Sequence, residues 1–130
     1  MSRSGYSDDC DGRALICWRG AVASAIKGKR GQAFLRELLE ALDGMPVKEL
    51  IPEDLERNGS YCALGVIGTR RGLDLKVIDA GNPKDVARHF KIAHALAAEV
   101  EFENDEGGWR DEPPEKRWTR MRRWTAENIK

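Results

Sequence analysis

The chain has 130 residues, of which 41% are hydrophobic and 34% are charged, so it can bury a core and is too apolar for a disordered polymer. Its 22 basic residues balance its 22 acidic residues, which counts against a dedicated nucleic-acid binder, because such proteins usually carry a basic excess. Cys10, Cys17 and Cys62 are odd in number and irregularly spaced, which counts against a disulfide framework and favours a reducing compartment.

Residues 1–12 are small, polar and acidic, and they predict a flexible acidic arm in front of a single helical domain at 13–130. The start of the chain lacks the apolar stretch of a signal peptide. No apolar run approaches the roughly 20 residues that a membrane-spanning helix needs. We therefore expect a cytoplasmic protein that makes no membrane contact.

Two helices joined by a short basic turn are expected first. Apolar residues recur at helical spacing over 13–27, and Gly28 ends that helix. The second helix, 32–43, has a wide apolar stripe and ends at Gly44 and Pro46. The short turn predicts that the two helices form an antiparallel hairpin.

A connector at 45–59, with one possible helical turn after Pro52, leads to a third helix that Ser60 would cap and that would run to Arg71. Gly65 and Gly68 lower its helix propensity, and tight packing is the favoured explanation for them. A buried strand is the alternative for 61–71, because Val66-Ile67 favours β-structure.

Leucine and valine alternate with polar residues over 73–77, which predicts one short strand or an extended segment. Asn82-Pro83 then opens a helix, with asparagine as the cap and proline in the first turn. Helical patterns follow at 92–102 and after 111–114. The fold class predicted is mainly α: a compact bundle of about five or six helices, with at most one short strand or hairpin.

The acidic stretch 99–106 lies at the C-terminal end of a predicted helix, where negative charge opposes the helix dipole. Either a basic segment lies close to it or the acids have another use. A metal-dependent enzyme that uses the acids of the segment 104–106, or Asp8, Asp9 and Asp11, is the weakest of three functional hypotheses.

No motif in the chain indicates catalysis or a cofactor, so we expect no cofactor and favour a protein that is not an enzyme. The segment 9–12 lacks the ligand spacing of a calcium loop and is better explained as a helix cap. His89 and His94 are five residues apart and diverge on a helix, so they predict no zinc site. Cys17 and Cys62 fall on apolar faces, which predicts small buried thiols.

Two basic surfaces are the candidate binding sites. One gathers around the first turn, where no acidic residue occurs between Arg13 and Arg36, and the other lies on the last helix, where arginines alternate with tryptophan. The alternative for the last helix is a solvated face whose charges pair with the acids at 99–106. The residues expected to bind are Lys27, Lys29, Arg30, Arg70, Arg71, Arg117, Arg120 and Trp124.

Several strings along the chain resemble a family of small uncharacterised proteins encoded by phages and prophages of Gram-negative bacteria. The resemblance covers nearly the whole chain, and its clearest markers are Cys-Ala-Leu-Gly-Val at 62–66 and Asn-Asp-Glu-Gly at 104–107. These strings carry no known chemistry, so the resemblance implies context and no catalytic residue.

The resemblance implies an accessory phage protein that acts by binding, in the cytoplasm of an infected or lysogenic bacterial host. We expect a protein partner from the host, the phage or a defence system such as CRISPR–Cas, with inhibition of that complex as one outcome. Nucleic-acid binding through the same basic surfaces is the alternative. Self-association is also compatible with a chain of zero net charge.

Overall fold

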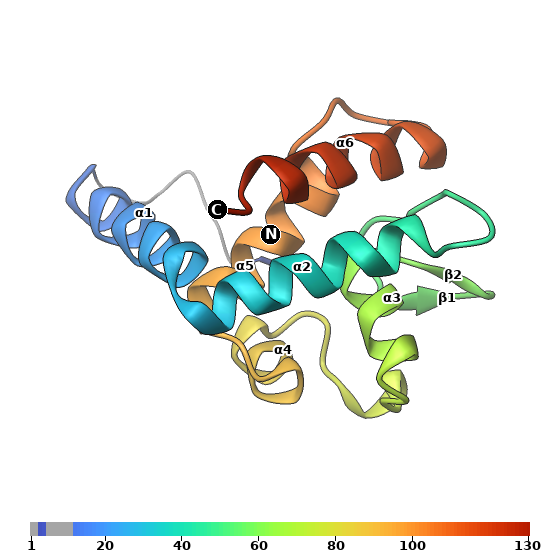
Figure 1. Cartoon of the computed structure of the whole chain (residues 1–130), viewed down its shortest axis with the longest axis horizontal. Coiled ribbons are helices and arrows are strands. Elements are labelled where there is room, and N and C mark those ends of the chain that lie inside the picture. Colours follow the sequence, from blue (N-terminus) through green and yellow to red (C-terminus); the bar gives the residue numbers. More distant parts are fainter. Residues whose placement is uncertain (1–2, 5–11) are drawn as a thin grey trace.

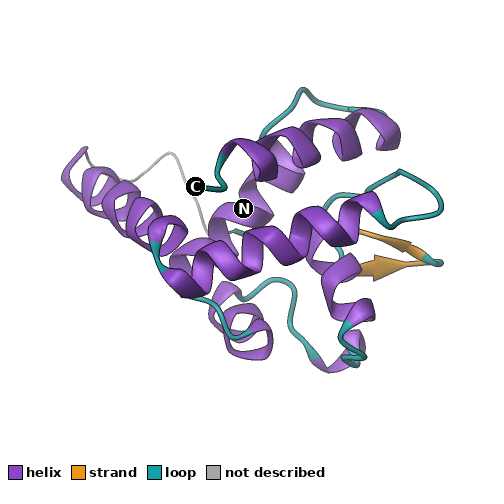
Figure 2. Cartoon of the chain, viewed as in Figure 1, coloured by secondary structure: helices purple, strands orange, loops and turns teal. Residues whose placement is uncertain are grey.

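The structure is a computed structural model that describes residues 3–4 and 12–130. In this part of the chain it contains six α-helices and one two-stranded hairpin (Figures 1 and 2). The prediction of a mainly helical bundle with at most one short hairpin is confirmed. The elements are α1 (Gly12–Lys27), α2 (Lys29–Asp43), β1 (Glu56–Arg57), β2 (Ser60–Tyr61), α3 (Ala63–Arg70), the 3₁₀ helix η1 (Leu75–Val77), α4 (Pro83–Phe90), α5 (His94–Glu106) and α6 (Pro114–Glu127).

Helix α2 runs across the middle of the molecule and contacts α1, α3 and α6 (Figure 1). Its apolar stripe forms the centre of the core, with Leu35, Leu38 and Leu42 fully buried. Helix α5 packs against α4, α1 and α3. The predicted stripe on the second helix is therefore the one that organises the bundle, because burying leucine side chains is the main favourable term in folding.

The two glycines in α3 allow close packing, as the sequence predicted. A Cβ on Gly65 would lie 1.9 Å from the carbonyl oxygen of Leu55, and one on Gly68 would lie 2.6 Å from the side chain of Leu75. Neither position has room for a side chain. The helical prediction is correct for Ala63–Arg70, whereas Tyr61 lies in β2, and the two glycines are present because of their neighbours.

Three details of the connector regions differ from the prediction. The hairpin lies at 56–61, inside the expected connector, and pairs Glu56 with Tyr61. The third helix is capped by Cys62, whose sulfur accepts a hydrogen bond from the Gly65 amide, so the prediction of Ser60 was wrong because Ser60 belongs to β2. Residues 75–77 form a 3₁₀ helix, since Asp74 caps it by accepting from the Lys76 amide.

The start of the fourth helix follows the prediction closely. The Asn82 side chain accepts a hydrogen bond from the Lys84 amide, and Pro83 is the first helical residue. A side-chain acceptor next to a residue that lacks an amide hydrogen resolves two of the unpaired groups at a helix start.

Two predictions of which side chains are buried and which are exposed were wrong. Cys17 is exposed on α1, next to Ile16, whereas Cys62 is buried as expected. Arg3 and Ser4 are buried, although they belong to the expected exposed arm. The rest of that arm up to Asp11, with Cys10 and the acids at 8, 9 and 11, lies outside the described residues.

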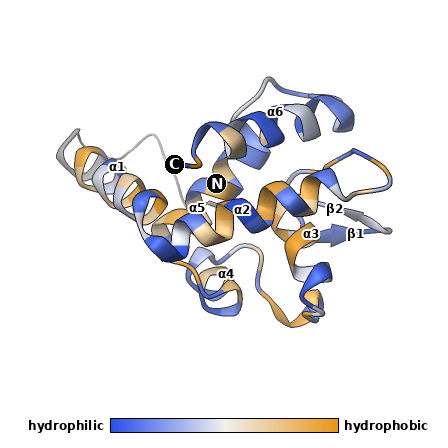
Figure 3. Ribbon diagram, in the orientation of Figure 1, coloured by the Kyte–Doolittle hydropathy of each residue, from blue (hydrophilic) through white to orange (hydrophobic). Residues whose placement is uncertain are grey.

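Helix α6 closes the bundle over α2 although most of its surface is hydrophilic (Figure 3). Met121 is its one large apolar side chain without exposure, and the indole nitrogen of Trp118 donates to the Leu42 carbonyl. The chain end is fixed by Gln32, which donates to the Asn128 carbonyl and accepts from the Lys130 amide. Polar contacts therefore hold this helix as much as apolar ones.

Candidate functional site

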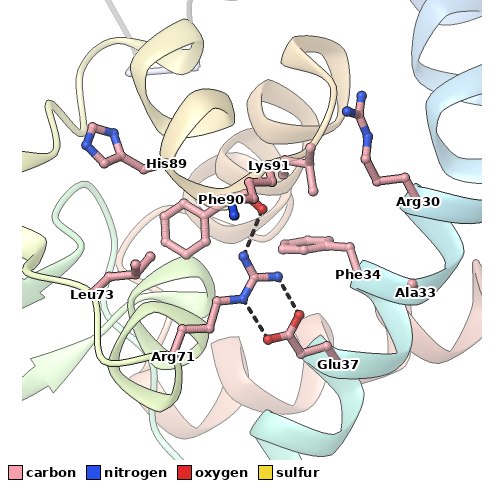
Figure 4. Close-up of a pocket in the computed structure, with 10 residues that line it drawn as sticks. Arg30, Ala33, Phe34, Glu37, Arg71, Leu73, His89, Phe90 and Lys91 are labelled. Atoms are coloured by element: carbon pink, nitrogen blue, oxygen red, sulfur yellow. Dashed lines mark hydrogen bonds and ion pairs between the residues drawn. The ribbon is translucent and has the colours of Figure 1, made fainter.

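An open groove of about 460 Å³ lies between α2, α4 and the loop that follows α3 (Figure 4). Its floor is apolar and its rim is mostly basic. Segments that are far apart in the sequence meet there, which is the usual origin of a binding site on a helical domain. The groove is lined by Arg30, Ala33, Phe34, Glu37, Arg71, Leu73, His89, Phe90, Lys91 and Ile92.

Arg71 is fixed in this groove by three sets of contacts. It forms a two-pronged ion pair with Glu37, in which Nε donates over 2.8 Å, and its Nη1 donates to the Phe90 carbonyl over 2.8 Å (Figure 4). Its guanidinium also lies 5.9 Å from the centre of the Phe90 ring. Hydrogen bonds from Arg71 hold the pKa of Glu37 below its usual value. Arg71 is thus a rigid, locally neutralised part of the groove wall.

Arg30 and Lys91 supply the excess positive charge. Both side chains are exposed, Arg30 on the first turn of α2 and Lys91 just after α4. Neither forms an ion pair with any residue that the structure describes. Lys91 adopts the left-handed conformation at φ 59° as the C-cap of α4, and its amide donates to the Ala87 carbonyl.

His89 lies at the far rim. Its Nδ1 is 2.9 Å from the Asp85 carbonyl oxygen, one turn earlier in α4, and its ring points away from Arg71 (Figure 4). The imidazole is therefore held by its own helix. It limits the width of the groove and does not contact the Arg71–Glu37 pair.

The structure places the first predicted basic surface partly in this groove. Arg30 and Arg71 line it, whereas Lys27 and Lys29 are exposed beside it at the junction of α1 and α2. Arg70 points to a neighbouring site, where it pairs with Glu40 over 3.3 Å. The sequence thus identified two of the groove's cations from segments about forty residues apart.

The second predicted surface, on α6, is largely internal. Arg117 is 5% exposed, and its Nε donates to the Asn104 carbonyl. Arg120 is half-buried, pairs with Glu112 over 2.9 Å and donates to the Glu103 carbonyl. Trp124 is partly buried against the core. Arg117 and Arg120 therefore stabilise the end of α5, and this fold does not offer them to a partner.

These contacts explain the acidic end of α5. Arginines from α6 reach the last carbonyls of α5 and the nearby carboxylates, so positive charge compensates the negative end of the helix dipole. The alternative that paired the last helix with the acids at 99–106 describes this region better than a binding surface, except that the pairing is buried and not solvated.

Three residues of the groove were missed by sequence reasoning. Glu37 and Lys91 were not among the predicted binding residues, and His89 was considered only for zinc. Glu37 lies seven residues after Arg30, two helical turns along the same face, and that spacing was the available signal. No local pattern places Lys91 beside Arg71.

In residues 3–4 and 12–130 no three histidine, cysteine or acidic side chains are grouped so that they could hold a metal ion. Among the helices of the same residues, none is both long enough and apolar enough to span a bilayer. Asn104 and Asp105 belong to the segment that the metal hypothesis named. Their side-chain oxygens accept hydrogen bonds from the Ala63 amide and from Arg3.

Comparisons with known proteins found no match: no protein-family model, no curated protein and no solved structure is similar to this chain.

Proposed function

We propose that this protein is a non-enzymatic accessory protein of phage type that binds a protein partner through the groove between α2 and α4. The observation that carries the proposal is the meeting of Arg30, Arg71 and Lys91, from three separate segments, over a floor made by Phe34 and Phe90. Basic side chains around an apolar floor suit a short segment that carries both charge and apolar surface.

The chemistry of the groove favours an acidic segment as ligand. Arg30 and Lys91 would contact one or two carboxylates, while an apolar side chain would lie on Phe34. Arg71 would contribute rigidity, because its hydrogen bonds are already made to Glu37 and to the Phe90 carbonyl. Electrostatic steering would then speed association and make it sensitive to salt.

Acidic residues on the same face count against a nucleic acid as the main ligand. Glu37 pairs with Arg71 inside the groove and Glu40 pairs with Arg70 next to it, so these two arginines are neutralised and few unpaired cations remain to contact a run of phosphates. One feature favours the nucleic-acid alternative: Lys27, Lys29 and Arg30 are all exposed at one junction. Capture of the partner with and without nuclease separates a protein ligand from a nucleic-acid ligand.

The phage context and an inhibitory role are parts of the same proposal. They rest on the sequence strings that resemble phage proteins and on no contact in the structure. A small domain that occupies a surface of a host or defence complex would inhibit it without any chemistry of its own.

The test is capture from a lysate of infected host cells with the tagged full-length protein, with and without nuclease. The expected result is a stoichiometric protein that survives nuclease and is lost with Arg30→Glu/Lys91→Glu. The matched control is Lys116→Glu/Arg123→Glu, two exposed residues of α6 with the same change of charge.

Two results would overturn the proposal. The first is a partner that both double variants retain equally, because the groove would then not be the site. The second is recovery of nucleic acid whose removal releases every protein, which would make the nucleic-acid alternative correct, with a steep loss of affinity as salt rises.

A further inference from the structure

Arg3 is buried against the last turn of α5 and is not among the residues that line the groove. Its Nε and Nη2 donate to the two carboxylate oxygens of Asp105 over 2.7 and 2.9 Å. The carboxylate of Asp105 is also fixed by residues other than Arg3, since it accepts hydrogen bonds from the Glu53 amide and from the Asn104 side chain. The two-pronged contact with a fixed carboxylate is the geometry by which proteins select a guanidinium over an ammonium group.

Asn104 orients this carboxylate. Its side chain accepts from the Ala63 amide over 3.1 Å and donates to the Ile51 carbonyl over 2.9 Å and to Asp105 over 2.8 Å. These contacts tie α5 to the start of α3 and to the connector. The Asn-Asp pair therefore builds one wall around the Arg3 guanidinium, and the contacts that Asn104 makes with Ala63 and Ile51 do not involve Arg3.

Glu101 forms the other wall, one helical turn before Asp105. Its side chain has no exposed surface, and its nearest charged atom is the Arg3 Nε at 3.4 Å. Neither of its carboxylate oxygens has a hydrogen-bond partner among the described residues, and the Arg3 Nη1 lacks one as well. A buried carboxylate without hydrogen bonds is costly, so its presence calls for a ligand or a proton.

The pocket therefore offers more acceptors than its occupant uses. Asp105 is fully engaged by Arg3, whereas Glu101 faces the same guanidinium without bonding to it. Burial raises the pKa of Glu101 to about 8, and Asp105 and Asp79 add to that effect while Arg3 opposes it. A proton on Glu101 would turn one of its oxygens into a donor and leave the other as an acceptor for a bound cation.

We propose that Glu101 and Asp105 form a binding site for a guanidinium group, which Arg3 fills within the same chain. Arg3 is thus a removable occupant that fastens residues 3–4 to α5, and its removal leaves a preformed site for an arginine-like ligand. A purely structural ion pair would lack this property, because loss of Arg3 would then let the pocket collapse or fill with any cation.

The experiment uses the full-length Arg3→Ala variant and methylguanidinium as the probe, with melting temperature as the readout. At about 50 mM, the probe is expected to raise the melting temperature of Arg3→Ala by at least about 2 °C. The melting temperature of the unchanged protein should not rise, because its site is occupied. Methylammonium and sodium chloride at equal concentration control for charge and ionic strength.

A second variant locates the effect. In Arg3→Ala/Asp105→Asn the two-pronged acceptor is gone, so methylguanidinium should no longer stabilise the protein. Should Arg3→Ala be unfolded at room temperature, the probe is expected to restore its helical circular dichroism signal.

Three results would overturn the proposal: no stabilisation or refolding of Arg3→Ala by methylguanidinium, an equal effect of methylammonium, or a response that persists after Asp105→Asn. The first would show that the pocket is not preformed. The second would show that it has no preference for a guanidinium, and the third would place the bound ion elsewhere.

Discussion

The arginines of α6 and the cations around the groove are the same kind of residue in two different roles. Arg117 and Arg120 are directed inward, onto backbone carbonyls at the end of α5 and onto Glu112. Arg30 and Lys91 remain on the surface beside an apolar floor. In this fold the arginines of α6 compensate the negative C-terminal end of α5 and are therefore not available to a partner. Among the described residues, the side chains of Arg30 and Lys91 make no such contact and remain available.

Arg71 combines the two roles, because it stabilises the fold and also lines the groove. It closes a contact between α2 and α4 through Glu37 and the Phe90 carbonyl. Loss of Arg71 should therefore change both the stability of the fold and the shape of the groove. A substitution of Arg71 would for that reason not separate an effect on binding from an effect on folding.

Removal of Arg117 should have the largest effect on stability. Arg117→Ala removes a buried cation that donates to the Asn104 carbonyl and lies 3.8 Å from Glu112, and it leaves both groups to Arg120 alone. Loss of one partner from a buried charged network typically costs about 3 kcal/mol. Urea unfolding measures the loss. Arg123→Ala, an exposed arginine on the same helix, is the control and should change stability by less than about 0.5 kcal/mol. Equal effects would mean that burial does not distinguish the two arginines.

Glu101 predicts a dependence on pH. Because the folded state raises the pKa of Glu101 to about 8, above its usual value, the folded protein holds this proton more tightly than the unfolded chain. Its contribution to stability is fully present below the unfolded pKa of 4.5 and is lost as the pH rises through about 8. Glu101→Gln should remove that loss. Urea unfolding of both proteins between these pH values checks it, and parallel curves would contradict it.

Arg71 and Arg70 sharpen the comparison, because they are adjacent and both pair with a glutamate of α2. Arg71→Ala should lower stability by about 2 kcal/mol, since three charge-assisted hydrogen bonds are lost in a half-buried setting. Arg70→Ala should lower it by less than about 1 kcal/mol, because the Arg70–Glu40 pair is exposed. Thermal unfolding gives both values, and a larger effect at Arg70 would contradict the structure.

The groove variant should have the smallest effect on stability. Arg30→Glu/Lys91→Glu changes two exposed side chains, so stability should move by less than about 0.5 kcal/mol for each. Affinity for the captured partner should nevertheless fall at least about tenfold, in line with the loss of two charge contacts. Calorimetric titration measures the affinity. A marked loss of stability would mean that the groove cations are structural too.

The sequence predicted those parts of the fold that local chemistry controls. The leucines of α2 and the Asn82-Pro83 start of α4 need only helical spacing and a cap, and both were found. One short hairpin was allowed for, but its position at 56–61 was not predicted, because its strands are two residues long and carry no alternating apolar pattern. η1 was mistaken for a strand because three residues of alternating polarity fit either structure.

The site was predicted in part for the same reason. Arg30 and Arg71 were chosen as exposed cations, but nothing local shows that Arg71 would find Glu37 or that Lys91 would join them. Arg117 and Arg123 are both followed by tryptophan and threonine, yet Arg117 is buried and Arg123 is exposed. Only the packing of α6 against α5 distinguishes them. Such tertiary pairings cannot be read from composition or period.

Hydrogen exchange of the protein alone and bound to the captured partner is the most direct measurement of where binding occurs. Binding in the groove should slow exchange of the amides at 30–37 and 89–92 and leave the outer face of α6 unchanged. Slowed exchange confined to α6 or to α1, with the groove unaffected, would contradict the assignment of the binding site.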